Sequence, residues 1–560
     1  MKKMKIMLLV LSLVISSQSC SKKESINEID STQKLYFNGK IYTVNENQPW
    51  AEAIVIENNK IVFIGSNGNA SDFVKENVEK IDLKGQLVLP GFHDVHMHPM
   101  EVGATNTTFT LDENEENIYN YLPVIKQASE NTSGNGWLIG FGHAITTLLE
   151  ATESPLELLD ETVPNRPVII MEHTSHSMWV NSKALELAGI TSESRNPTGG
   201  IIMKDNGELN GILIDNAGDI VFQLAQKSSE NNNSEYDGMI NYVLPELAKY
   251  GITSVSDART YWKREQHKVW QNLEKDGRLT ARFNLGLWAY PEADDNAQIA
   301  SLKALYSNSE NSLLKINQIK LYSDGITHNT TAALHSDYHI DYFNQSTNNG
   351  LNYFTEDRIA RYIQELEGIG FDFHIHAIGN RGISEALNAI ENGSNLKNRH
   401  RLTHVEMVNN EDIQRFKQLH VIADAQVAGD FTKPEFWQEN AALVGTTLAN
   451  NLIPIKSFTD AGVRLTLSSD WNVSTLNPFV GIQNAITRAP QNISLNEAIK
   501  AYTINGAYVM RQEEKVGSLE VGKLADFIVV DKDIFTIPTN QIKTAKIVLT
   551  VFNGKEIYKK

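Results

Sequence analysis

The stretch "PGFHDVHMHPM", from Pro90 to Met100, places His96 and His98 two residues apart directly after an apolar run. In an extended strand, side chains at positions i and i+2 point to the same face, so the two imidazoles would converge on one point. Imidazole is a common ligand of divalent metal ions. The spacing also fits two hydrogen-bonded histidines, so a metal site requires further ligands from other parts of the chain.

Further ionisable side chains stand within or just after other apolar runs. They are Lys320, with Asp324 beyond it, in "INQIKLYSDG", His374 and His376 in "FDFHIHAIG", His404 in "RLTHVEMV", and Asp470 in "VRLTLSSDW". Such groups are costly to bury unless something compensates for the loss of water. A centre of one or two divalent ions of the zinc type, bound through nitrogen and oxygen, would compensate for all of them together.

The elements that must position these residues alternate between short apolar runs and amphipathic helical stretches. The expected strands cover residues 85–98, 251–258, 282–289, 316–325, 371–379, 401–408, 420–427 and 463–471. Alternation of this kind predicts an α/β fold with a parallel sheet and crossover helices. Eight units predict a (β/α)8 TIM barrel, whose active site lies at the C-terminal ends of its strands.

Two further regions extend the predicted barrel of residues 89–510. Residues 35–88 and 511–560 are rich in strand-forming runs broken by Asn-Gly turns, which predicts one small β-sandwich built from both termini. About 150 residues separate the first two barrel strands, far more than a crossover needs. We therefore expect an insertion at about 101–249 that caps the barrel mouth.

The first residues have the pattern of a secretory signal. Lys2, Lys3 and Lys5 precede the apolar run "IMLLVLSLVI" and the small polar residues before Cys20. Cys20 is the single cysteine, which excludes a disulfide framework, and its position resembles a bacterial lipobox. We expect a lipoprotein signal peptide at 1–19, lipidation of Cys20 and a polar tether at 20–34. The alternative is ordinary signal cleavage near an incidental cysteine.

The composition restricts the partners. A net charge of -18 argues against nucleic acid and against an anionic membrane surface, because both require basic patches. The expected partner is a small molecule, and the expected membrane contact is only the lipid at Cys20, on the periplasmic or outer-surface side. A homo-oligomer is left open. The chain contains no Gly-x-Ser-x-Gly elbow and no phosphate-binding loop, so serine hydrolase and nucleotide chemistry are disfavoured.

The motifs "LPGFHDVHMHP", "IKLYSDG", "HAIGN", "RLTHVEMV" and "SSDWN", in this order, resemble those of the metal-dependent amidohydrolase superfamily. The C-terminal "VGSLEVGKLADFIVVD" fits the split β-sandwich of that superfamily. The stretch "HSMWVNSKALELAGI" points more narrowly to amidohydrolase family 3, the YtcJ-like hydrolases. This resemblance covers nearly all of the chain after the expected signal peptide.

The resemblance implies a role for each motif residue. His96 and His98 would bind a first metal ion, His376 and His404 a second, Lys320 would bridge both after N-carboxylation by carbon dioxide, and Asp470 would bind the first ion and move the proton. A buried lysine has a lowered pKa, and its neutral amine can capture carbon dioxide. Two alternatives stay open: in one, Lys320 pairs as an ammonium with Asp324 over a single ion, and in the other, His374 takes the place of His376 as a ligand.

The implied reaction is hydrolysis of a carbon–nitrogen bond in a non-peptide amide, a formamide or a cyclic amide, by metal-activated hydroxide with Asp470 as the proton carrier. In the insertion, His176, Trp179 and Asn181 could contact substrate, although Trp179 fits core packing equally well. Asp324 and His328 are further candidates near the site. Other hydrolytic or deaminating chemistry on the same scaffold is one alternative. A non-catalytic, surface-tethered binding lipoprotein is the other.

The lipid attachment can be tested directly. We expect the precursor, produced with its own leader in a bacterial host, to incorporate labelled palmitate and to enter the detergent phase on phase separation. Cys20→Ser removes the thiol that would carry the lipid, so this variant should incorporate no label and remain in the aqueous phase. Equal partitioning of both proteins would contradict lipidation and favour ordinary signal cleavage.

Overall fold

The computed structural model of the chain describes residues 33–105, 109–228, 232–343, 346–395, 398–429, 433 and 437–560. The expected signal peptide, the expected lipid attachment at Cys20 and nearly all of the expected tether lie outside these residues. Among the helices of the described residues, none combines the length and the apolar character needed to cross a membrane.

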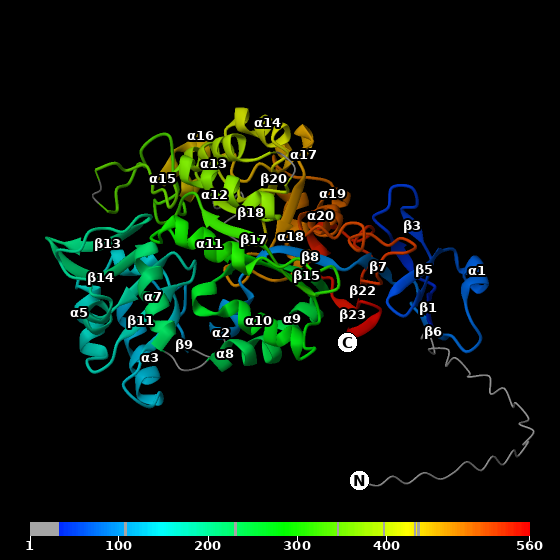
Figure 1. Ribbon diagram of the computed structural model, residues 1–560, viewed down its shortest axis with the longest axis horizontal. Coiled ribbons are helices and arrows are strands. Elements are labelled where there is room, and N and C mark those ends of the chain that lie inside the picture. Colours follow the sequence, from blue (N-terminus) through cyan, green and yellow to red (C-terminus); the bar gives the residue numbers. More distant parts are fainter. Residues whose placement is uncertain are drawn as a thin grey trace, which may run out of the picture.

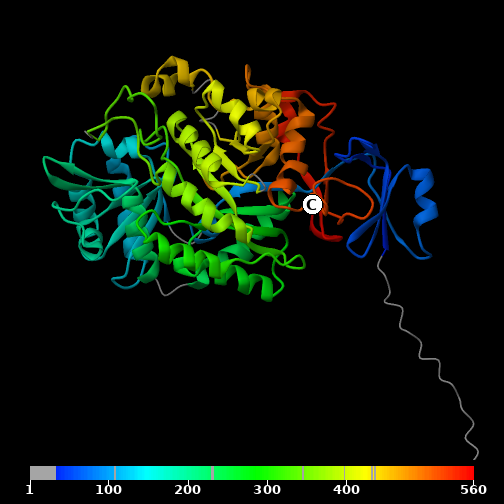
Figure 2. The same ribbon diagram turned by 45° about the horizontal axis from the view of Figure 1, so that its top comes forward.

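Eight parallel strands curve into a nearly closed barrel (Figures 1 and 2). In sheet order they are β8 (Phe92–Met97), β15 (Ile252–Thr260), β16 (Arg282–Trp288), β17 (Leu314–Tyr322), β18 (Asp372–Ala377), β19 (Arg401–His404), β20 (Ile422–Gln426) and β21 (Leu465–Ser468). The first and last strands meet at their C-terminal ends. There the Asp470 amide donates to the His96 carbonyl oxygen and the His98 amide to the Trp471 carbonyl oxygen, each at 2.8 Å. The predicted eight-stranded parallel barrel is confirmed.

The first predicted barrel strand is divided in two at Gly91. Residues of β7 (Leu87–Pro90) pair with a different sheet, and β8 begins immediately after the glycine. A Cβ atom at Gly91 would lie only 2.6 Å from Cγ2 of Thr253, so this crossing leaves no room for a side chain. The single strand predicted over 85–98 is therefore two strands in two different sheets. Which sheet each half joins depends on the strands that lie beside it.

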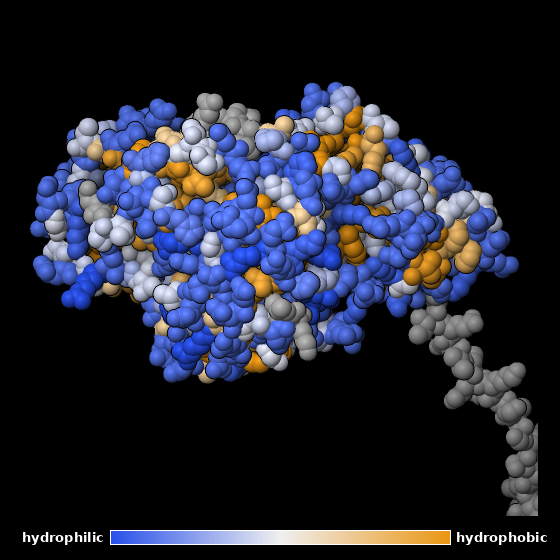
Figure 3. Space-filling view, turned by 90° about the horizontal axis from the view of Figure 1, so that it is seen from above, coloured by the Kyte–Doolittle hydropathy of each residue, from blue (hydrophilic) through white to orange (hydrophobic). Residues whose placement is uncertain are grey.

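Amphipathic helices cover the outside of the barrel (Figure 2). In α12 (Glu356–Leu366), the buried Ile359, Tyr362, Ile363 and Leu366 recur at helical spacing and form the face turned to the sheet. The other helices after β15 include α10 (Gln266–Lys275), α11 (Asp295–Leu305), α13 (Asn380–Gly393), α14 (Asn410–Gln418), α17 (Ile455–Ala461), α18 (Pro478–Thr487), α19 (Leu495–Ala501) and α20 (Ile504–Val509). Hydrophilic residues cover most of the face seen from above (Figure 3).

Strands from both ends of the chain lie together at one end of the molecule, drawn in blue and red in Figure 1. One sheet has the order β5-β4-β1-β6 and the other β24-β23-β22-β7-β2-β3. The strands are β1 (Gln33–Phe37), β2 (Lys40–Tyr42), β3 (Trp50–Ala51), β4 (Ala53–Glu57), β5 (Lys60–Gly65), β6 (Glu79–Asp82), β22 (Phe527–Val530), β23 (Ile547–Phe552) and β24 (Lys555–Lys559), together with β7. Tyr36 and Phe527 pack edge to face at 4.9 Å, so the two sheets share one core.

The segment between β8 and β15 forms its own six-stranded sheet at the end of the molecule opposite the β-sandwich (Figure 1). In sheet order its strands are β13 (Gly200–Asp205), β14 (Glu208–Asp215), β12 (Ser177–Val180), β11 (Val168–Glu172), β10 (Leu138–His143) and β9 (Phe109–Thr110). Alternate residues bury in two separate cores: Ile170 and Trp179 belong to one, Ile169 and Met178 to the other. Helices on both faces cover this sheet, among them α3 (Ile118–Asn131), α5 (Pro155–Thr162), α6 (Ser182–Ala188) and α7 (Asn216–Ser228).

A buried ion pair joins the barrel to the β-sandwich. Arg282, at the start of β16, donates to Asp526, which also accepts the Asn553 amide at 2.7 Å. Removing one partner of a buried pair leaves the other charge uncompensated and costs about 3–5 kcal/mol.

We therefore expect Asp526→Ala to lower clearly the urea concentration at the midpoint of unfolding. The matched control is Lys268→Ala, which breaks a solvent-exposed pair with Glu265 and should leave the midpoint unchanged. Equal midpoints for both variants would show that the buried pair contributes nothing.

Candidate metal centre

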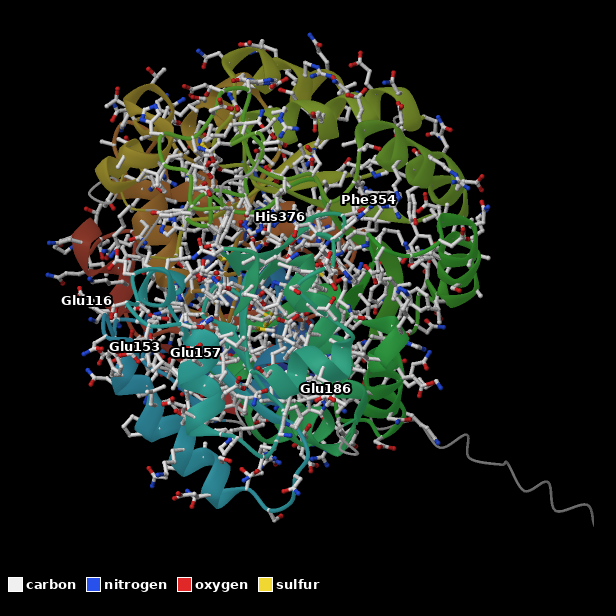
Figure 4. The ribbon with its side chains drawn as sticks, turned by 90° about the vertical axis from the view of Figure 1, so that its left-hand side faces the viewer. Glu116, Glu153, Glu157, Glu186, Phe354 and His376 are labelled. Atoms are coloured by element: carbon white, nitrogen blue, oxygen red, sulfur yellow. The ribbon has the colours of Figure 1, made fainter. Side chains whose placement is uncertain are left out.

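A cavity of about 520 Å³ opens at the C-terminal ends of the barrel strands. Its wall is shared between the barrel and the loop that joins β11 to β12 in the insertion. The barrel contributes His98, His376, His404 and Asp470, among others, and the insertion contributes residues 173–176. Figure 4, viewed from the insertion side, shows His376 near the centre of the molecule. Four of the six sequence-predicted ligands therefore meet at this cavity, although they come from the ends of four different strands.

Three of the predicted histidine ligands lie around the carboxylate of Asp470. Its Oδ1 atom lies 3.3 Å from Nε2 of His96 and 3.2 Å from Nε2 of His98, and its Oδ2 atom lies 3.9 Å from Nδ1 of His404. Ligand atoms of His96, His404 and Asp470 all lie within 4.8 Å of one another. Burial alone would raise the pKa of Asp470, but the adjacent imidazoles hold it well below its usual value.

The backbone at these residues is held in an uncommon conformation. His404 has φ 74° and Asp470 has φ 53°, both in the left-handed region that is unfavourable for residues with a side chain. Asp94 helps to hold this arrangement, since its carboxylate accepts the Ser469 and His96 amides at 3.2 Å. Such strain persists only where surrounding contacts enforce it, and it is concentrated at functional sites.

The second ring nitrogen of His96 faces a buried polar layer beneath the site. Nδ1 of His96 lies 2.8 Å from both Nε2 of His374 and Oγ1 of Thr403. The other nitrogen of His374 receives a hydrogen bond of 2.6 Å from Arg401. Both nitrogens of His374 therefore already have partners. Ligand atoms of His96, His374 and Asp424 also lie within 4.8 Å of one another. Because the hydrogen bonds just described, and that from Thr403 to Asp424, already occupy these atoms, the triad orients the ligands of the site and is not a second metal site.

His376 differs from His374 because only one of its two ring nitrogens makes a hydrogen bond. Its Nε2 donates to the Gly325 carbonyl oxygen at 3.0 Å, whereas its buried Nδ1 has no hydrogen-bond partner among the described residues. The ring centroid lies 4.4 Å from that of His404. Burial lowers the pKa of His376 well below 6.5, so the ring is neutral and Nδ1 offers its lone pair. This geometry favours His376 over His374 as a ligand.

Lys320 is fully buried at the end of β17, and its Nζ atom has no hydrogen-bond partner within the described part of the chain. Burial lowers its pKa well below the usual value; Asp470 opposes this shift, while Arg401 and Arg259 add to it. The alternative in which Lys320 pairs with Asp324 is wrong. The Asp324 carboxylate instead accepts the backbone amides of residues 333, 378 and 379 at 2.7–3.0 Å and holds two loops together. The same bonds remove Asp324 as a substrate contact.

The remaining expected substrate contacts divide into two groups. His176 and His328 line the cavity. Trp179 is fully buried with its Nε1 atom donating to the Pro155 carbonyl oxygen at 2.9 Å, and Asn181 caps α6 by accepting the Ala184 amide at 3.1 Å. Their place in the core of the insertion corrects the expectation that Trp179 and Asn181 contact substrate.

Sequence reasoning missed three residues that line the cavity, Arg259, Tyr322 and Glu406. It also missed Glu101, which accepts two hydrogen bonds from Arg259. Arg259 follows the predicted strand 251–258 by one residue, and Glu406 follows His404 by two, so a search of every strand end for charged residues would have found both. Burial raises the pKa of Glu406 to about 7. The signal for Glu101 is weak, because it lies beyond the motif on α2 (Pro99–Thr105).

The donor set fits a metal centre. Buried Nζ of Lys320, Nδ1 of His376 and Oδ1 of Asp470 have no hydrogen-bond partner among the described residues, which is costly unless a ligand compensates. Imidazole nitrogen and carboxylate oxygen are the ligands that zinc and related divalent ions prefer. His96, His98 and Asp470 would hold one ion, and His376 and His404 would hold another.

The choice between the two histidines of β18 can be measured by metal content. We expect the purified protein to retain one or two divalent ions per chain, and His376→Ala to retain fewer, because it loses the unpartnered Nδ1 atom. The control is His173→Ala, a cavity-lining histidine outside the ligand group, which should keep the full content. Elemental analysis of the three proteins decides the point. Undiminished metal in His376→Ala would remove this residue from the ligand set.

Comparison with known proteins agrees with the site. Residues 79–558 match the amidohydrolase family. The putative amidohydrolase YtcJ of Bacillus subtilis is 27% identical over 556 residues, which cover 94% of this chain and 99% of that protein. The N-substituted formamide deformylase of Arthrobacter pascens is 24% identical over 555 residues, covering 93% and 97%. The crystal structure of an uncharacterized metal-dependent hydrolase from Pyrococcus furiosus has a TM-score of 0.69 at 25% identity, covering 90% of this chain and 99% of that one. With the match extending through the ligand-bearing barrel and into the C-terminal strands, this chain belongs to the amidohydrolase family.

Proposed function

We propose that the protein hydrolyses a carbon–nitrogen bond of a small non-peptide amide, such as a formamide or a cyclic amide, with one or two divalent metal ions as cofactor. Membership of the amidohydrolase family supports the reaction type. The observation that carries the proposal is the convergence of His96, His98 and His404 on the Asp470 carboxylate at 3.2–3.9 Å. A relative whose name is N-substituted formamide deformylase supports formamides as one substrate class.

The chain's own groups would hold the cofactor. His96, His98 and Asp470 would bind the first ion, and His376 and His404 the second. A bound divalent ion makes a water molecule acidic and polarises a carbonyl group. Zinc suits this set of ligands. In this proposal Lys320, after carboxylation by carbon dioxide, would be a ligand shared by both ions. Carboxylation requires the neutral amine, and burial favours that form.

Asp470 would carry the proton. Its Oδ1 atom, which lies 3.3 Å from Nε2 of His96 and 3.2 Å from Nε2 of His98, would be the ligand atom, and Oδ2 would remain for proton transfer. Oδ2 accepts the proton of the attacking water and then gives it to the departing nitrogen. The products are a carboxylic acid and an amine, or a single ring-opened amino acid from a cyclic amide. No covalent acyl-enzyme forms, because water is the nucleophile.

We also propose that this activity lies outside the cytoplasm, with the protein anchored to a bacterial membrane by lipid at Cys20. The cysteine pattern described above supports this location. A small amide that reaches the cell surface or the periplasm is then the substrate, and no nucleic acid takes part.

The central test is hydrolysis of a panel of N-formyl amines, N-acyl amines and lactams, with amine release as the readout. We expect wild type to act on at least one class and Asp470→Asn to lower kcat by about 10³-fold, since a proton carrier typically contributes about 10²–10⁴-fold. His420→Asn alters an exposed histidine in the turn after α14, outside the cavity, and is the control that should keep its activity on the same substrates.

Metal content separates the outcomes. Near two ions per chain in active wild type would support the bridging role of Lys320, whereas about one ion would contradict it. Activity only toward esters, lactones or amino-substituted rings would replace amide hydrolysis by another reaction of the same site. A protein without metal and without activity after reconstitution would contradict the enzyme proposal and favour a binding lipoprotein.

A further inference from the structure

A histidine from the insertion presents one free nitrogen to the cavity. His176 lies in the loop before β12, is 7% exposed and lines the cavity. Its Nδ1 atom is 2.5 Å from Oδ1 of Asp215, at the end of β14, and its carbonyl oxygen accepts the Asp215 amide at 2.8 Å. A carboxylate only accepts hydrogen bonds, so the proton shared with Asp215 is on Nδ1, and in the tautomer protonated there alone Nε2 carries the lone pair. With Nδ1 held by Asp215, Nε2 is the ring nitrogen left for the cavity that His176 lines.

A tyrosine from the barrel presents the complementary group. Tyr322, the last residue of β17, is 4% exposed and lines the same cavity. Its hydroxyl oxygen accepts from Nη1 of Arg259 at 3.3 Å, and Arg259 is held in turn by two hydrogen bonds of 3.0 and 3.1 Å to Glu101. A guanidinium group cannot accept a hydrogen bond. The hydroxyl proton of Tyr322 therefore has no acceptor within the described part of the chain and is available to a ligand.

The two groups lie together beside the proposed metal ligands. The rings of His176 and Tyr322 are nearly parallel, with centroids 5.7 Å apart. Both are close to His376, at centroid distances of 5.6 and 4.1 Å. Gly325 makes room for this contact between insertion and barrel, because a Cβ atom there would lie 2.8 Å from Oδ2 of Asp215. One acceptor and one donor thus face the same cavity at the metal side.

We propose that these two groups recognise the amide itself: the Tyr322 hydroxyl donates to the carbonyl oxygen of the substrate, and Nε2 of His176 accepts its N–H. The inference rests on the proposed carbon–nitrogen hydrolysis and narrows it. The substrate class is an amide that retains an N–H, which means an N-monosubstituted formamide, a secondary acyl amide or a lactam. A fully N-substituted amide lacks this donor and leaves His176 unpaired. Asp215 and Arg259 are positioning residues.

The test compares an N-alkylformamide with its N-methylated counterpart on the metal-loaded enzyme. His176→Asn keeps an amide group that can donate to Asp215 in place of Nδ1 but removes Nε2. Tyr322→Phe removes only the hydroxyl. The control is His420→Asn, which alters an exposed histidine in the turn after α14, outside the cavity. Metal content is measured for every protein, so that loss of the cofactor is not mistaken for loss of recognition.

The expected pattern separates the two roles. Wild type and the control should prefer the substrate with the N–H by about tenfold or more in kcat/KM, because a site built to bond an N–H rejects an analogue without it. His176→Asn should lower kcat/KM for that substrate by about tenfold and leave the N-methylated substrate nearly unchanged, so that the preference disappears. Tyr322→Phe should lower kcat/KM for both substrates by a similar factor of about 10–10², with kcat falling more than KM rises.

Other results overturn the proposal. If wild type hydrolyses both formamides equally, or if His176→Asn keeps the preference, the histidine does not read the N–H while the proposed function stands. If Tyr322→Phe leaves both rates unchanged, the hydroxyl does not contact the carbonyl. If metal-loaded wild type hydrolyses neither formamide nor any other amide of the panel, the proposed function fails, and the recognition pair fails with it.

Discussion

Burial of nitrogen and oxygen ligands at one end of the barrel is the constraint on which the rest of the structure depends. The rings of His96, His98, His376 and His404 lie 4.4–5.5 Å from their neighbours in this group, far too close for several of them to carry charge in a buried site. Burial lowers the pKa of His96, His376 and His404, which keeps these rings neutral. Neutral imidazoles around one carboxylate form a site prepared for a cation.

The layer beneath the site sets the direction of each ring. A histidine can offer only one nitrogen to the cavity when the other is held, and here Thr403 and His374 hold His96 while the Gly325 carbonyl oxygen holds His376. Arg401 lies below them, fully buried, and donates to the Val95 carbonyl oxygen as well as to His374. Such outer hydrogen bonds fix ring orientation before any ligand arrives, which lowers the entropic cost of binding.

The insertion gives the barrel a second set of walls. Its sheet packs an apolar core on each face, so the loop between β11 and β12 is carried on a well-packed support. That loop brings His176 against Tyr322 of the barrel. The barrel strand ends thus supply the ligands, while the insertion supplies contacts that can differ between related enzymes without disturbing the metal site.

What the sequence by itself determined was local. Apolar runs with alternating faces predicted all eight barrel strands, and the two-residue spacing of His96 and His98 placed both rings on one face, because strand periodicity depends only on neighbouring residues. The order of the motifs was enough to indicate the family. The convergence of Asp470 with these histidines followed from the barrel rule that strand ends meet, so the centre of the site was also within reach.

Tertiary structure alone decided the contacts between distant segments. Periodicity placed His374 and His376 on the same face, and only the Arg401 and Gly325 hydrogen bonds distinguish them. Asp324 has a carboxylate that could bind a metal ion, yet that carboxylate accepts hydrogen bonds from three backbone amides of other loops. The sequence left open whether Trp179 contacts substrate or packs in a core, and its full burial in the insertion shows that it packs in the core. In each case the chemical type of the residue was visible in the sequence, but its partner came from a part of the chain that only folding brings near.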